Sequence, residues 1–220
     1  MIFPQLSPNW FLGYNVALEL IFAIVALIIG AFAFKIYKKT NQQQIKLFGI
    51  SFAFISASYI VQAIFNTMAI IEANEHTNLL IELSSIVWFQ MMGVYTNIIL
   101  TIIGLCTLAY MTFKTNKTRI LYLMIIISLL GIFLSANILY MFFLFSTIYL
   151  LVILVHFIKN YLENKQKNSL LIAIAFIFLL IGSIHFMISV NHQLFYAIGH
   201  ILELIAYMLI LTNFYLVLRK

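Results

Sequence analysis

Three histidines and a glutamate interrupt an otherwise apolar stretch at residues 185–204, HFMISVNHQLFYAIGHILEL. His200 and Glu203 are three residues apart, a spacing that places both side chains on one face of a helix. Imidazole and carboxylate groups together can bind a divalent metal ion, act as an acid–base pair or hydrogen-bond a polar ligand. A second carboxylate, that of Glu19, lies within the first apolar run of the chain.

These residues predict a candidate metal site. His185, His200, Glu203 and Glu19 would supply four nitrogen and oxygen ligands, which is the number and kind that zinc takes in proteins. Zinc with an open coordination position could activate water for hydrolysis of a lipid-like substrate, with Glu19 or Glu203 as the general base. A different hypothesis uses His185 and His200 as axial ligands of a b-type haem.

The composition determines which elements have to position these groups. Hydrophobic residues make up 65% of the 220, charged residues only 8%, and aspartate is absent. A soluble domain would have about 25% charged residues, so the sequence predicts an all-α integral membrane protein. Residues 1–220 are expected to form a single transmembrane domain in contact with the lipid bilayer. The net charge of +6 fits anionic lipid head groups, and no nucleic-acid partner is expected.

Apolar runs separated by short polar gaps predict the number of membrane spans. A helix needs about 20 apolar residues to cross the bilayer. Residues 120–158 carry no charge and are too long for one helix, so a turn is expected at Ser135-Ala136-Asn137. The predicted bundle therefore has seven transmembrane helices, over residues 14–37, 45–70, 80–113, 119–135, 138–160, 169–189 and 194–218.

The basic residues predict the orientation of this bundle, because lysine and arginine are enriched in cytoplasmic loops. With seven spans, all twelve fall on one side, which places the N-terminus outside and the C-terminus in the cytoplasm. With six spans, the two ends would share a side and the positive charge would be divided between both faces. The twelve are Lys35, Lys38, Lys39, Lys46, Lys114, Lys117, Arg119, Lys159, Lys165, Lys167, Arg219 and Lys220.

Polar side chains from several predicted spans lie at one depth. A helix rises about 1.5 Å per residue, which places Glu19, Gln62 and Asn97 about 24–26 Å from the nearest cytoplasmic cation. His185, His200 and Glu203 lie at about 24–28 Å on the same basis. We expect an outer-half polar cavity lined by the first, second, third, sixth and seventh spans, because polar stripes avoid lipid. Its expected ligand-binding residues are Glu19, Tyr59, Gln62, Asn66, Asn97, Tyr196 and Tyr207.

The favoured function is non-enzymatic binding of a small molecule or metal ion by a sensor, by a receptor-like protein or by a subunit of a membrane complex. A membrane-protein partner is expected in the last case. The metal-dependent hydrolase and the b-haem protein remain alternatives, and Gln62, Asn66, Asn97 and Thr101 could instead serve only as interhelical hydrogen bonds. High usage of Ile, Lys and Asn suggests a prokaryotic genome and hence a multi-pass protein of the cell membrane.

Overall fold

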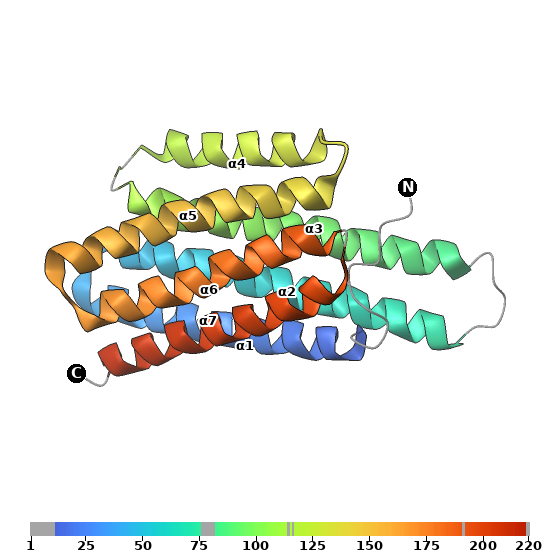
Figure 1. Ribbon diagram of the computed structural model, residues 1–220, viewed down its shortest axis with the longest axis horizontal. Helices are drawn as coiled ribbons and strands as arrows, with labels where there is room; N and C mark the ends of the chain where they lie inside the picture. The colour runs from blue at the N-terminus through green and yellow to red at the C-terminus, as the bar shows by residue number, and fades with distance from the viewer. Residues whose placement is uncertain (1–11, 76–81, 114, 116, 191, 219–220) are drawn as a thin grey trace.

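The computed structural model describes residues 12–75, 82–113, 115, 117–190 and 192–218, and nearly all of them are helical. The described residues form seven antiparallel α-helices whose axes run close to the long axis of the molecule (Figure 1). They are α1 (Leu12–Thr40), α2 (Gln43–Glu75), α3 (Glu82–Thr112), α4 (Thr118–Phe133), α5 (Ile138–Asn164), α6 (Lys167–Ser189) and α7 (Leu194–Leu218).

Six of these helices form a closed ring. Each of α1, α2, α3, α5, α6 and α7 packs against its two neighbours in that order, and α7 returns to contact α1. Helix α4 lies outside the ring and contacts α3 and α5 (Figure 1). The ring surrounds a central space that five of its helices line.

The six ring helices are each long and apolar enough to cross a membrane, which makes the chain a polytopic helical membrane protein in contact with the bilayer. Helix α4 has 16 residues and spans about 24 Å, which is less than the roughly 30 Å of hydrocarbon. Length and composition therefore support six spans among the described residues. Crossing by α4, and with it the seven-span topology, stays a prediction.

The predicted turn after the fourth apolar run is present between α4 and α5. Residues 134–137 are not helical, and the Asn137 side chain caps α5 by accepting a hydrogen bond from the Tyr140 backbone N–H at 3.0 Å. Helix α4 contacts the ring through a hydrogen bond between the hydroxyl groups of Ser128, which is fully buried, and Tyr149 on α5. The chain therefore reverses direction where the sequence predicted it.

Glycines allow close approach between neighbouring ring helices, as is common in membrane bundles. A Cβ atom added at Gly182 of α6 would lie 3.3 Å from the backbone oxygen of Gly199 on α7. One added at Gly199 would lie 2.6 Å from the ring of Phe186. The contact between α6 and α7 therefore needs small residues at these two positions.

The described basic residues gather at one end of the bundle. Lys38 and Lys39 are in the last turn of α1, while Arg119 follows the end of α3 and Lys165 follows the end of α5. Because α1, α3 and α5 all end on the same side (Figure 1), these cations share that side. We refer to it below as the basic end of the bundle.

Candidate functional site

A cavity of about 150 Å³ lies inside the ring. Helices α2, α3, α5, α6 and α7 contribute its walls, whereas α1 does not line it. Residues of very different polarity line it: Phe52, Ile55, Tyr59, Gln62, Val94, Asn97, Ile98, Thr101, Leu105, Leu108, Leu139, Phe142, Phe143, Ser146, Leu150, Phe176, Leu179, Gly182, Ser183, Phe186, Tyr196, His200, Glu203 and Tyr207.

The two ends of this cavity differ in chemistry. The lining residues nearest the basic end are aromatic or aliphatic, because α2, α3, α5 and α6 all place apolar side chains there. The hydrogen-bonding side chains that line the cavity lie farther from the basic end, mainly on α2, α3 and α7. The apolar floor comprises Phe52, Leu105, Leu108, Leu150 and Phe176, and the polar end comprises Tyr59, Gln62, Asn97, Tyr196, His200 and Glu203.

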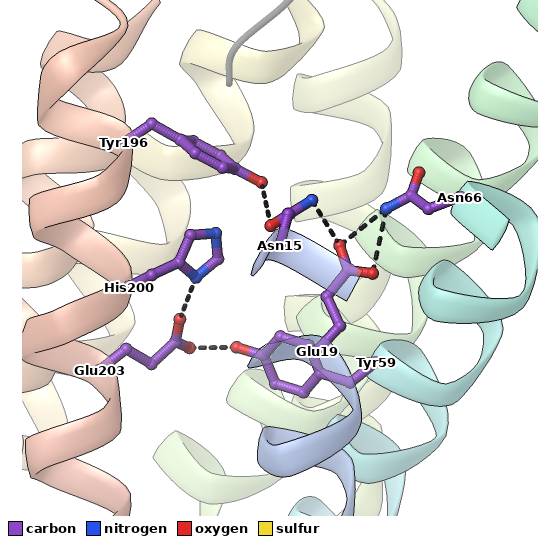
Figure 2. Close-up of polar contacts among 7 residues, drawn as sticks. All are labelled: Asn15, Glu19, Tyr59, Asn66, Tyr196, His200 and Glu203. Carbon is purple, nitrogen blue, oxygen red and sulfur yellow. Dashed lines mark hydrogen bonds and ion pairs between the residues drawn. The ribbon is translucent and has the colours of Figure 1, made fainter. Parts of the chain in front are cut away.

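Glu203 is held at the cavity wall by two neighbours (Figure 2). The Tyr59 hydroxyl of α2 donates a hydrogen bond to Glu203 Oε1. His200 Nδ1, one turn earlier on α7, lies 3.5 Å from Glu203 Oε2. The His200 and Glu203 side chains are only 6% and 12% exposed. The carboxyl group therefore sits in a largely buried setting that joins α2 to α7.

Aromatic rings surround this group. Tyr196 and His200 meet edge to face with ring centroids 4.5 Å apart, and the centroid of Phe186 lies 4.9 Å from that of His200. Tyr59 and Tyr207 meet edge to face at 6.3 Å. Phe22 of α1, which is fully buried, packs behind Tyr59 at 5.3 Å. The polar end of the cavity is therefore a carboxyl group in an aromatic enclosure.

The second carboxyl group, that of Glu19, forms an adjoining cluster behind the cavity. It is 1% exposed, and Asn66 Nδ2 of α2 lies 2.8 and 3.0 Å from its two oxygens. Asn15 Nδ2 donates to Glu19 Oε1 at 3.0 Å. The Tyr196 hydroxyl donates to Asn15 Oδ1 at 3.2 Å. Tyr196 therefore links the cluster around Glu19 to the ring of His200 (Figure 2).

The structure divides the predicted ligand-binding residues into two groups. Tyr59, Gln62, Asn97, Tyr196 and Tyr207 line the cavity. Glu19 and Asn66 do not, because they hydrogen-bond each other across the contact between α1 and α2.

The walls also differ from those expected. The wall expected from the first span comes from α5, through residues such as Phe142 and Ser146. Sequence reasoning also missed the link from Tyr196 to Asn15, for which the chain carries no local signal.

The four predicted zinc ligands are not brought together. His185 is partly exposed and does not line the cavity; its Nδ1 lies 2.8 Å from the backbone oxygen of Ile181. Its ring is 5.5 Å from that of Phe195. Across the part of the chain that the structure describes, no three His, Cys, Asp or Glu side chains are placed to share a metal ion. In the haem hypothesis, His200 lines the cavity, whereas its partner His185 does not.

Comparison of the chain with protein-family models, curated proteins and solved structures found no match.

Proposed function

We propose that this protein binds a small amphiphilic molecule inside the membrane, as a sensor, as a receptor-like protein or as a subunit of a membrane complex. The observation that carries this proposal is the cavity, which has a hydrogen-bonding end and an apolar floor. A ligand with one polar group and a compact hydrocarbon part would match both ends. Ligand sites commonly combine apolar walls with a few well-placed polar groups.

The size of the cavity limits the ligand. Its volume of about 150 Å³ is similar to that of an engineered protein cavity that binds benzene. A ligand of about six to ten non-hydrogen atoms would fill it. Burial of the hydrocarbon part contributes about 25 cal/mol for each Å² of apolar surface removed from water.

The polar end would select ligands by hydrogen bonding. A polar group buried without a partner costs several kcal/mol, on the order of 2–7 depending on the reference. Glu203, Gln62 and Asn97 offer acceptors and donors that a ligand could use. A purely apolar molecule would leave these groups without a ligand partner.

We also propose that the protein lies in the cell membrane with seven spans, its N-terminus outside and its C-terminus in the cytoplasm. The common side of the cations at the ends of α1, α3 and α5 supports this, because basic loops stay in the cytoplasm. Helix α4 crosses as the seventh span, with the bilayer thinning locally to match its length. The polar end of the cavity then lies in the outer leaflet.

Binding is tested with benzyl alcohol, which joins a hydroxyl group to a six-membered ring. Purified protein in phosphatidylcholine nanodiscs should bind it above the level of empty nanodiscs, as measured by saturation-transfer NMR. Ser146→Leu is the matched variant, because Ser146 lines the cavity and its hydroxyl bonds only the Phe142 backbone oxygen of its own helix. The larger side chain should fill the cavity and abolish the signal. Equal binding by both proteins, with unchanged helical content, would contradict the proposal.

A further inference from the structure

We propose that the ligand is a small organic ammonium ion whose charged nitrogen binds at Glu203 and whose hydrocarbon part rests on the apolar floor of the cavity. This inference rests on the proposed function and adds the charge class of the ligand. Three features of the described residues support it: the sign of the charge, the free capacity of the carboxyl group and the surrounding rings.

The cavity lining contains a carboxyl group and no cationic partner of fixed charge. Its titratable lining residues are Tyr59 on α2 and Tyr196, His200, Glu203 and Tyr207 on α7, while α3, α5 and α6 contribute only neutral side chains. The helix behind it, α1, adds another carboxyl group at Glu19. Lysine and arginine do not occur among the lining residues. An anionic ligand would therefore meet carboxyl groups, whereas a cation would be attracted.

The Glu203 carboxyl group has capacity for a further hydrogen bond. An ionised carboxylate can accept about four hydrogen bonds. Tyr59 donates one to Oε1, and the approach of His200 Nδ1 to Oε2, at 3.5 Å, is long. Because Glu203 lines the cavity, an ammonium N–H can reach it from the ligand side. Charge-assisted hydrogen bonds of this type are about twice as strong as neutral ones.

Aromatic side chains complete the recognition. Tyr59, Tyr196, Tyr207 and Phe186 all line the cavity close to Glu203. The negative faces of aromatic rings attract cations, and cages of such rings are a known means of recognising organic ammonium groups. A neutral alcohol gains only the hydrogen bond, whereas an ammonium ion gains the hydrogen bond, the carboxylate charge and the attraction of the aromatic rings that line the cavity.

A matched set of probes separates these contributions. Benzylamine, benzyl alcohol and benzoate share one ring and differ in the charge of the polar group. In phosphatidylcholine nanodiscs, isothermal titration at neutral pH should give a dissociation constant for benzylamine about tenfold or more below that for benzyl alcohol, and no binding of benzoate. Glu203→Gln should raise the dissociation constant of benzylamine about tenfold and change that of benzyl alcohol by less than about threefold.

Glu163→Gln is the control for a general effect of charge. Glu163 lies at the basic end of α5, where its side chain is 55% exposed and 3.9 Å from Lys159, so its loss should leave both affinities unchanged. If Glu203→Gln fails to fold, Tyr196→Leu against Tyr196→Phe tests the rings instead. The leucine variant should weaken the binding of benzylamine more than that of benzyl alcohol, whereas the phenylalanine variant should keep the preference for benzylamine.

The outcomes distinguish the two proposals. Benzyl alcohol bound as tightly as benzylamine, or an equal loss in Glu163→Gln and Glu203→Gln, would overturn the ammonium assignment and leave the binding cavity in place. Failure of every probe to bind the wild-type protein above empty nanodiscs would overturn the proposed function as well.

Discussion

The contact between Glu19 and Asn66 should be a main source of stability between α1 and α2. Asn66→Leu keeps an apolar side chain of similar size and removes both of the contacts, at 2.8 and 3.0 Å, that the Asn66 amide makes with Glu19. The Asn15 contact at 3.0 Å remains. The variant therefore leaves a carboxyl group that is 1% exposed with one of its three side-chain hydrogen bonds.

The magnitude follows from the type of bond. Neutral interhelical hydrogen bonds in membranes contribute about 0.6 kcal/mol each, which gives a lower figure of about 1.2 kcal/mol for two. Hydrogen bonds to a charged group contribute about 1.5–3 kcal/mol. Both contacts come from one amide nitrogen, so we count a single charged hydrogen bond as the upper figure and expect Asn66→Leu to lower the free energy of unfolding by about 1–3 kcal/mol. Glu19→Gln should lower the free energy of unfolding by a similar amount. The side-chain NH2 group of the glutamine would face the Asn66 NH2 group, and neither can accept a hydrogen bond from the other.

A double-mutant cycle isolates the interaction. The combined Glu19→Gln, Asn66→Leu variant should lose about 1–2 kcal/mol less than the sum of the two single losses. Unfolding free energies come from SDS titration in mixed micelles, followed by circular dichroism. Thr67→Val is the control, because Thr67 is exposed and its hydroxyl bonds only the Ala63 backbone oxygen of its own helix. If Asn66→Leu loses no more stability than this control, or the cycle is additive, the reasoning is refuted.

Two further predictions concern packing and topology. Gly199→Ala should lower the free energy of unfolding by about 1–3 kcal/mol, because the added methyl group would lie 2.6 Å from the Phe186 ring. Gly13→Ala is the control and should not destabilise the protein, because a methyl group added there would have no neighbouring side chain within 4 Å. An equal loss of stability in both variants would contradict the close contact between Gly199 and Phe186. In a Cys106→Ser background, a cysteine at the exposed position Ala136 should react with a membrane-impermeant maleimide added to intact cells. Labelling only after lysis would exclude the seven-span orientation.

The positions of the helices could be predicted because hydropathy changes sharply at their ends. Every predicted helix end lies within five residues of the observed one. The least obvious boundary, within the uncharged residues 120–158, was indicated by Ser135 and Asn137, which favour turns and helix caps. Polar gaps and caps are local signals, so one sequence is enough to find them.

That Gln62, Asn97, His200 and Glu203 come together in one cavity could be predicted from their spacing along the helices, whereas the direction in which each polar side chain points could not. His200 and Glu203 lie together because their spacing of three residues fixes a common face. His185 points elsewhere, because α6 consists almost entirely of apolar residues and packing therefore sets its rotation about its axis. The replacement of α1 by α5 in the cavity wall has the same origin. Contacts across helices, such as that from Tyr196 to Asn15, depend on this rotation.

The different lengths of α1 and α4 affect the surrounding lipid. Up to its first lysine, α1 has 23 residues (12–34), and α4 has 16 in all, so these lengths are about 34 and 24 Å. If α4 crosses the bilayer, as we propose, the perimeter of the protein has no single hydrophobic thickness. Lipids with shorter acyl chains would match the side formed by α4 at lower cost, whereas longer chains suit the side formed by α1. We expect an asymmetric annulus of bound lipid, through which membrane thickness would act on one side of the molecule more than on the other.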